Sequence, residues 1–324
     1  MNAGKRECGT LAAMRCARTL GATAFAAVAA ITLSGHARAA DQPLADPYEL
    51  PDAPRSLGLP ELTHPDIEWT ATTSVGAVAA QRHNGAEGLE QIGVEVPLST
   101  RRWFAGMVYE AAEGRPVAAP GSSGIVGGNL ELYGRTVWAT RTGLAFGGGV
   151  GILPPIATFT RDVGGGDTAL AAISMQPWDY SFFRIGALTF RPFIDVRDLF
   201  GRFVVQFRMA LDWSVQTRDT SDSDVSATAS VYFGYIATPI LGLGLEATEF
   251  YRIDALIPDN ERANVLLTPS VRLLTPGIQP ALGAFVGVGS PLDPAAHGVV
   301  GLRLALTFVW DPRRPFFRAL DFLK

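Results

Sequence analysis

The sequence predicts an all-β fold, an antiparallel up-and-down transmembrane β-barrel of about twelve strands, on three observations. From residue 67 to 310, apolar and polar residues alternate with a period of two, as in a strand that separates two faces. Most alternating segments run 10 to 15 residues, whereas strands of soluble proteins average about five or six. The connections between them alternate between long and short, as the loops and turns of a transmembrane barrel do.

Residues 1–39 are expected to form a secretory signal peptide. A basic region comes first, with Lys5, Arg6, Arg15 and Arg18, and an apolar stretch follows from Leu20 to Leu33. Ala37-Arg38-Ala39 then fits a small-x-small cleavage site. The alternative is an N-terminal membrane anchor, but the apolar stretch is shorter than the ~20 residues of a membrane-spanning helix. Both cysteines, Cys8 and Cys16, lie in this segment, so the mature chain has none.

Residues 40–66 are predicted to form a proline-rich periplasmic arm or plug. Prolines recur through the segment, at positions 43, 47, 51, 54, 60 and 65. Proline interrupts helices and cannot donate to the ladder of a sheet. The sequence leaves open whether the arm enters the barrel.

The alternation is clearest over residues 202–215. One face is apolar and carries Phe203, Val205, Phe207, Met209, Leu211, Trp213 and Val215. The other face is mostly polar and carries Arg202, Gln206, Arg208, Asp212 and Ser214. A helix would scatter both sets around its surface, so the segment is predicted to be a strand.

Twelve such segments are predicted, at 67–79, 89–98, 102–111, 128–139, 143–152, 185–197, 202–215, 225–237, 240–253, 263–274, 280–289 and 298–310. The long connections are 80–88, 112–127, 153–184, 216–224, 254–262 and 290–297. The short connections are 99–101, 140–142, 198–201, 238–239 and 275–279. If the N-terminus is periplasmic, every long connection is external, and the even strand count returns the C-terminus to the periplasm.

Five tryptophans lie at strand ends on the apolar face and are predicted to form girdles at the two membrane interfaces. Trp69, Trp103, Trp138 and Trp310 fall at the predicted periplasmic ends, and Trp213 falls at an external end. Aromatic rings prefer the headgroup level of a bilayer. The alternative, tryptophans in the core of a soluble sandwich, would place them in strand middles.

From residue 67 to 310 the chain resembles Gram-negative outer-membrane β-barrel proteins of the porin and channel type. Its last segment, Leu302-x-Leu304-x-Leu306-x-Phe308-x-Trp310, is similar to the terminal strand that such proteins present to the assembly machinery. Here residues 311–324 continue beyond it as a predicted periplasmic tail. The resemblance implies the cell outer membrane as the location, reached after export, with outer-membrane lipids and the barrel assembly machinery as partners.

In a membrane barrel the apolar face points to lipid and the polar face points into the lumen. The candidate lumen and selectivity residues are Arg191, Asp195, Arg197, Arg202, Gln206, Arg208, Asp212, Glu131 and Arg135. One interpretation is a charged constriction that selects anionic solutes. The other is a self-neutralising ladder of acids and bases that supports the wall.

Two further features are open to more than one interpretation. Glycines at 147, 149 and 151 face the polar residues of segment 128–139, and they indicate either local bending of the barrel or a ligand niche. The connection 153–184, with a candidate short helix at 168–176, is longer than most structureless loops. It is expected to be a lumen plug, a cap or a mobile surface loop.

Catalysis finds little support in the sequence, and no cofactor or metal is predicted. The mature chain has three histidines, His64, His83 and His297. His83-Asn84-Gly85 has the His and Asn of outer-membrane phospholipases, but no serine completes a similar motif. There is no metal-ligand spacing, phosphate loop or nucleophile elbow, and no basic block that would indicate nucleic acid as a partner.

The predicted function is a channel or transporter for small solutes through a narrow lumen lined by Arg and Asp. Eight strands leave a lumen filled by side chains and about sixteen leave an aqueous channel, so about twelve predict a narrow pore. The alternative is a closed outer-membrane barrel with an enzymatic or structural and surface-interaction role. A soluble periplasmic β-sandwich is the third hypothesis.

Overall fold

A computed structural model describes Pro54, Ser56, Leu57 and residues 69–80, 83–98, 103–114, 124–139, 144–159, 180–217, 223–253, 263–275, 277–289 and 300–310. All of these lie in the second of two compact units, Tyr48–Lys324. The predicted signal peptide, the tail 311–324 and the candidate helix 168–176 lie outside the described residues. No helix among the described residues is long and apolar enough to cross a membrane.

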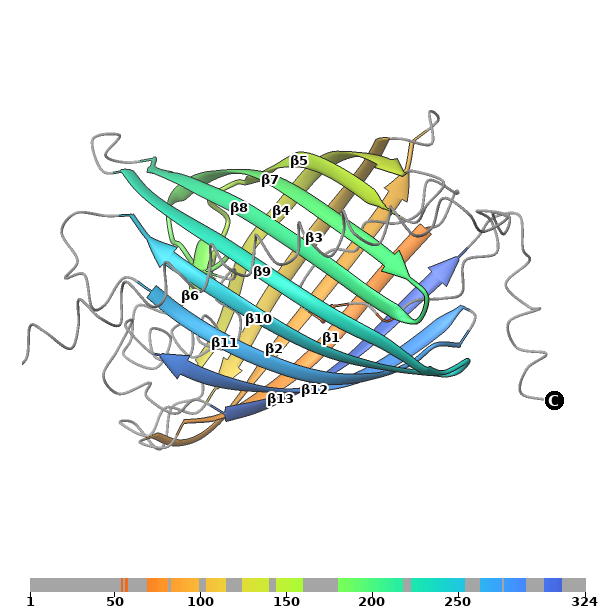
Figure 1. The fold of residues 1–324 in the computed structure, drawn as a ribbon. Helices are drawn as coiled ribbons and strands as arrows, with labels where there is room; N and C mark the ends of the chain where they lie inside the picture. The colour runs from red at the N-terminus through yellow and green to blue at the C-terminus, as the bar shows by residue number, and fades with distance from the viewer. Residues whose placement is uncertain are drawn as a thin grey trace, which may run out of the picture. The chain divides into compact units, whose positions relative to one another are not determined.

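Twelve long strands form one antiparallel sheet (Figure 1). They are β1 (Trp69–Ala80), β2 (His83–Pro97), β3 (Trp103–Gly114), β4 (Gly124–Ala139), β5 (Ala145–Leu153), β7 (Ala187–Phe200), β8 (Phe203–Gln216), β9 (Ser223–Thr238), β10 (Leu241–Arg252), β11 (Ala263–Leu273), β12 (Ile278–Gly289) and β13 (Val300–Trp310). A two-residue strand, β6 (Thr158–Phe159), pairs with β4. The predicted fold class is confirmed, and all twelve predicted segments are strands.

The sheet closes on itself. Each long strand pairs with its neighbour in the chain, and β1 pairs with β13 from Trp69↔Trp310 to Ala79↔Val300. The additional pairing of β3 with β4 completes the ring of twelve. Closure leaves no sheet edge with unpaired backbone groups, which is the condition for crossing lipid with strands. The single closed sheet also contradicts the hypothesis of a soluble sandwich, which needs two packed sheets.

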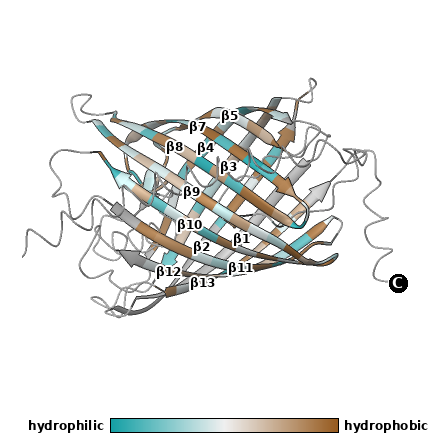
Figure 2. Cartoon of the chain, in the orientation of Figure 1, coloured by the Kyte–Doolittle hydropathy of each residue, from teal (hydrophilic) through white to brown (hydrophobic). Residues whose placement is uncertain are grey.

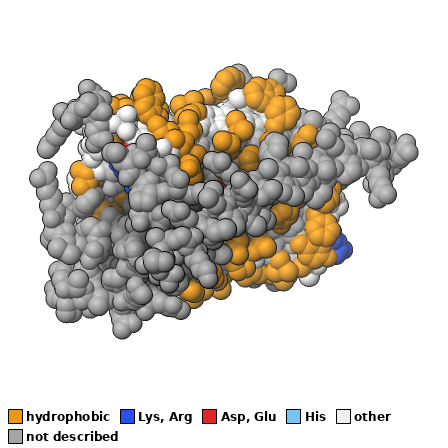
Figure 3. Space-filling view, turned by 60° about the vertical axis from the view of Figure 1, so that its left-hand side comes forward, with side chains coloured by type: hydrophobic (Ala, Val, Ile, Leu, Met, Phe, Trp, Pro, Cys, Tyr) orange, Lys and Arg blue, Asp and Glu red, His pale blue; other side chains and the backbone are white. Residues whose placement is uncertain are grey.

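The apolar face of the strands points outward. In β13, Leu302 and Leu304 are 58% and 59% exposed, whereas Arg303 between them is 5% exposed. Figure 2 shows the alternation of hydrophobic and hydrophilic positions along β7 and β8, and Figure 3 shows hydrophobic side chains spread over the described outer surface. An apolar surface of this kind is suited to contact with lipid tails.

The rings of three girdle tryptophans are exposed near strand ends. Trp103 begins β3, Trp138 lies one residue before the end of β4, and Trp213 lies three residues before the end of β8. Trp138 stacks on Phe146, and Trp213 packs against Phe190. Trp69 and Trp310 are paired through their backbones at the β1–β13 seam, but their side chains lie outside the described set.

The turns 201–202 and 239–240 lie at one end of the barrel, which we call the short-turn end, and the opposite end is the long-loop end. The prediction of a long connection at 80–88 is wrong. β1 continues to Ala80 and β2 begins at His83, and these two residues are paired. The segment around Asn84-Gly85 extends the β1–β2 ladder beyond a bulge after Val78, because backbone pairing there overrides the local preference of Asn-Gly for a turn.

We predict that an arginine at Leu304, near the middle of β13, lowers the free energy of unfolding in lipid vesicles by about 2–4 kcal/mol. The guanidinium of Leu304→Arg would face the hydrocarbon core. The matched control is Ile125→Arg, since Ile125 is also exposed but lies one residue from the long-loop end of β4. Its cost is expected to be about 0–1 kcal/mol. Urea titration of both variants measures the difference, and equal costs would contradict the outward assignment of β13.

Candidate functional site

The candidate functional site is the lumen. Positions that alternate with the exposed apolar residues are buried on the inner face of the wall, and many of them are charged. They include Glu95, Glu110, Glu131, Arg135, Arg191, Asp195, Arg208 and Asp212. A charge removed from water needs an opposite charge and hydrogen bonds, so the arrangement of these groups decides what space the lumen retains.

The structure buries seven of the nine candidate lumen residues: Glu131, Arg135, Arg191, Asp195, Gln206, Arg208 and Asp212. Arg197, near the end of β7, is partly buried. Arg202 differs from the prediction, because β8 begins at Phe203 and Arg202 lies in the turn with an exposed side chain. Its neighbour Gly201 has φ +63°, a left-handed conformation that glycine adopts without a steric penalty and that this tight turn uses.

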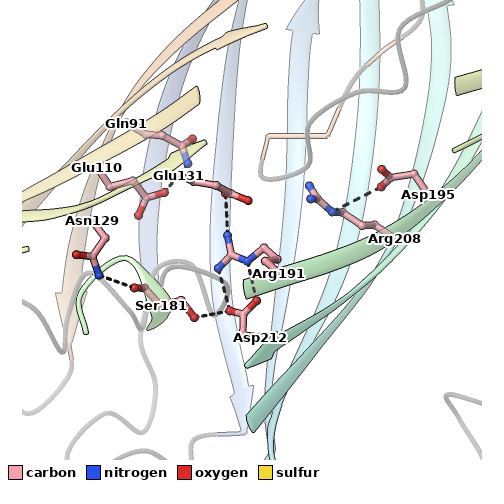
Figure 4. Close-up of polar contacts among 9 residues, drawn as sticks. All are labelled: Gln91, Glu110, Asn129, Glu131, Ser181, Arg191, Asp195, Arg208 and Asp212. Atoms are coloured by element: carbon pink, nitrogen blue, oxygen red, sulfur yellow. Dashed lines mark hydrogen bonds and ion pairs between the residues drawn. The ribbon is translucent and has the colours of Figure 1, made fainter. Parts of the chain in front are cut away.

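Arg191 is the centre of the largest ion-pair cluster (Figure 4). Its Nε and Nη2 lie 2.7 and 2.9 Å from the two carboxylate oxygens of Asp212 on β8. Its Nη1 lies 2.9 Å from Oε2 of Glu131 on β4. The fork of the guanidinium therefore binds two carboxylates from opposite sides of β7, which is a strong geometry for a buried charge.

The end of the third long connection folds into the lumen against this cluster. Ser181 Oγ donates a hydrogen bond to Asp212, and the Asn129 side chain donates to the carbonyl oxygens of Ser181 and Arg184 at 3.0 and 2.9 Å. Phe182 is buried, and the Arg191 guanidinium lies 5.3 Å from the centre of its ring. Residues 180–184 of this loop thus lie inside the barrel rather than on its surface.

The same turn reaches the far wall through Tyr180. Its hydroxyl donates to Oδ2 of Asp224 on β9 at 3.1 Å, and Arg184 and Arg252 lie 3.0 and 3.3 Å from the same oxygen. Burial raises the pKa of Tyr180 above its ordinary value, with the nearby Arg184 acting in the opposite direction. The turn 180–184 therefore spans the lumen from β4 to β9 and β10, and it narrows any passage.

A second cluster joins β2, β3 and β4. Arg135 Nε and Nη2 lie 2.6 and 2.5 Å from the two oxygens of Glu95, and the Tyr133 hydroxyl donates to Glu95 at 2.9 Å. The guanidinium also lies 5.1 Å from the centre of the Phe104 ring. Arg135 and Glu95 neutralise one another, which supports the interpretation of a ladder for this part of the wall.

The third pair, Asp195 with Arg208, is looser. The closest approach is 3.6 Å, from Arg208 Nε to Asp195 Oδ1, and the guanidinium lies 4.5 Å from the centre of the Phe193 ring. Within the part of the chain that the structure describes, neither carboxylate oxygen of Asp195 accepts a hydrogen bond. Of these three ion pairs, this one therefore retains the most hydrogen-bonding capacity for binding water or a solute.

The glycines of β5 make room for side chains from β4. A Cβ on Gly151 would overlap Oε1 of Glu131, and a Cβ on Gly149 would lie 2.7 Å from Cβ of Arg135. The space that suggested a ligand niche is therefore filled by the long side chains of the ion-pair clusters.

The wall formed by β9 to β13 carries many small groups beside larger inward side chains, which include Tyr232, Phe250, Phe285 and Arg272. Its buried inward residues include Ser226, Thr228, Ser230, Thr248, Thr268, Thr307, Ala281 and Ala305. Arg303 crosses the seam and donates to Gln91 at 2.6 Å, and Gln91 donates to Glu110 at 2.5 Å. Hydroxyl groups and small side chains thus make up much of the inner face of β9 to β13, alongside these larger residues.

Sequence reasoning missed the inner contacts of Tyr180, Ser181, Asn129 and Asp224. Asn129 and Asp224 lie on segments predicted to be strands, but their partners come from a loop whose path has no periodic signal. The available signal in the sequence was the adjacent pair Phe182 and Phe183, followed by Arg184. Two neighbouring phenylalanines in a loop need an enclosed site, and both are buried in the structure.

We predict that Asp212→Ala lowers the free energy of unfolding by about 3 kcal/mol, because it removes the carboxylate that Arg191 binds through two nitrogens and leaves Ser181 without its acceptor. Asp195→Ala is the matched control and is expected to cost about 1 kcal/mol, since Asp195 accepts no hydrogen bond from described residues. Urea unfolding in vesicles measures both. Limited proteolysis at the 180–184 turn should increase only in Asp212→Ala, and equal behaviour would rule out the proposed docking of the turn.

No protein-family model matches the chain, and no curated protein matches it. Among solved structures, the chain is similar to an outer membrane channel from Pseudomonas putida F1, with a TM-score of 0.53 and 13% identity over 76% of this chain and 97% of that one.

Two more distant structures are the NanC porin and the β domain of the Bordetella autotransporter BrkA. The NanC porin has a TM-score of 0.49 and 11% identity, over 74% of this chain and 98% of that one. The BrkA β domain has a TM-score of 0.43 and 11% identity, over 75% and 98%. The likeness concerns the fold: together with the closed ring and the apolar outer surface, it shows that the chain has the fold of an outer-membrane β-barrel.

Proposed function

We propose that the protein is a narrow channel for small hydrophilic solutes. The observation that carries the proposal is the asymmetry of the lumen. Long, paired charges fill the side formed by β2 to β8, whereas the side formed by β9 to β13 presents more hydroxyls and small side chains, among larger inward residues such as Tyr232, Phe250 and Arg272. A polar wall of small groups gives a dissolved solute hydrogen-bonding partners while leaving it space.

The tight ion pairs have a structural role in this proposal. Arg135 and Arg191 each bind a carboxylate through two nitrogens, so their charges are balanced and their side chains are held in place. They support the wall against collapse and position the turn 180–184 across the lumen.

Arg208 is the residue proposed to act on solute charge. Its pair with Asp195, at 3.6 Å, is longer than the pairs of Arg135 with Glu95 and of Arg191 with Asp212, and its side chain is slightly exposed. A cation on the wall that is incompletely balanced favours anions in a narrow pore. This keeps the predicted filter on β7 and β8 but removes Arg202 from it.

We predict stepwise conductance from the refolded mature protein in a planar bilayer, with a reversal potential that shifts toward cation preference in Arg208→Ala. The control is Arg202→Ala, which removes the same charge from the exposed turn and should leave selectivity unchanged within error, apart from a small surface effect that disappears at high salt. Equal shifts in both variants would contradict a filter at Arg208.

The alternative is a closed barrel with a structural role. It is supported by the turn 180–184, which crosses the lumen and is hydrogen-bonded on both sides. This alternative would be favoured if the folded, heat-modifiable barrel shows no conductance, both as the wild type and as the variant Leu57→Asp. The described residues contain no group of His, Cys, Asp and Glu that could hold a metal.

A further inference from the structure

Three residues of the proline-rich arm lie against the lumenal face of β9 to β13. Pro54, Ser56 and Leu57 are all buried, and Leu57 forms a cluster with Ala281 on β12 and Ala305 on β13. Ala281 and Ala305 alternate with the exposed Leu282 and Leu304, so they face the inside of the barrel. The arm therefore occupies the side of the lumen that the larger ion-pair clusters leave open.

The wall is shaped to receive these residues. A Cβ on Gly234 would lie 2.8 Å from Cγ of Pro54, and a Cβ on Gly242 would lie 2.7 Å from Cβ of Pro54. A Cβ on Gly283 would overlap Cδ1 of Leu57. Side chains at these glycines would thus fill the space that Pro54 and Leu57 now occupy.

Glu246 on β10 provides a polar anchor between the two apolar contacts. Ser56 Oγ donates to Glu246 Oε2 at 2.6 Å, and Ser230 Oγ donates to Oε1 at 2.7 Å. Glu246 is 3% exposed, and a buried carboxylate is costly unless donors surround it. The arm therefore supplies one of the hydrogen bonds that Glu246 needs while the lumen is closed.

We propose that the lumenal surface formed by Gly234, Gly242, Glu246, Ala281, Gly283 and Ala305 is a binding surface whose occupant is the chain's own arm. Pro54, Ser56 and Leu57 act as an internal plug, and the plug leaves the surface when the channel conducts. This inference rests on the proposed channel function and adds its regulation.

The arm is the element suited to leave, in contrast to the turn 180–184. The turn is anchored by Asn129, Asp212 and Asp224, through side chains and backbone on three strands. The described contacts of the arm include a hydrogen bond from Ser56 to a carboxylate and apolar contacts on glycine and alanine. Water entering the lumen can replace the hydrogen bond that Ser56 donates to Glu246.

The decisive experiment locks the plug with a disulfide in the full mature chain, which has no cysteine of its own. Leu57→Cys with Gly283→Cys is the first pair, because Leu57 Cδ1 is two bonds from its Cβ and overlaps the site of a Cβ on Gly283. Pro54→Cys with Gly242→Cys is the second pair. Disulfides need Cβ atoms about 3.5–4.5 Å apart, so the second pair, whose Cβ atoms would lie 2.7 Å apart, requires an adjustment of roughly 1 Å.

We expect oxidation of either pair to reduce the open probability in planar bilayers by about tenfold or more, and reduction with dithiothreitol to restore it. The four single-cysteine variants are the controls and should not respond to oxidant. Failure of both pairs to form a disulfide in the folded barrel would overturn the placement of the plug. Disulfide formation with unchanged conductance would overturn its closing role while leaving the channel proposal intact.

A second variant opens the plug without a crosslink. Leu57→Asp places a charge against Ala281 and Ala305, and it should raise the open probability about tenfold relative to the isosteric control Leu57→Ile. Equal open probabilities for these two variants would also count against the plug. If the wild type, the reduced pairs and Leu57→Asp are all silent despite correct folding, the channel function itself fails.

Discussion

Closure of the hydrogen-bonded ring is the constraint on which the rest of the structure depends. In hydrocarbon, an unpaired backbone group costs several kcal/mol, so a sheet crosses lipid only when its first and last strands meet. The β1–β13 seam and the β3–β4 pairing complete that ring. Closure turns one face of every strand toward lipid and the other toward an enclosed space. The apolar face therefore points outward, whereas in a soluble protein it points to the core.

The enclosed space then determines the chemistry of the wall. Twelve strands surround a lumen too wide to be filled by ordinary side chains and narrow enough for side chains from distant strands to meet. Arg191 reaches Asp212 and Glu131, Arg135 reaches Glu95, and the turn at Tyr180 reaches Asp224. The inner face of β9 to β13 carries more small residues, and the arm residues Ser56 and Leu57 pack against that face.

The alternating residues of segment 202–215 predicted a strand and its two faces, because only in a strand do successive side chains point to opposite faces. The same reasoning placed Asp195, Arg208 and Asp212 on the inner face. It failed for Arg202, whose place in a two-residue turn depends on the backbone conformation of Gly201. It failed also for the first connection, since the ladder between Ala80 and His83 depends on pairing between chain segments.

The sequence by itself determined the twelve strands, their antiparallel order and which face meets lipid, because these follow from local periodicity and from the need to close the sheet. Only the tertiary structure decided which charges pair across the lumen, that residues 180–184 cross it, and that Pro54, Ser56 and Leu57 enter it. These contacts join residues far apart in the chain. Contacts between side chains across a closed barrel produce no periodic pattern in the sequence.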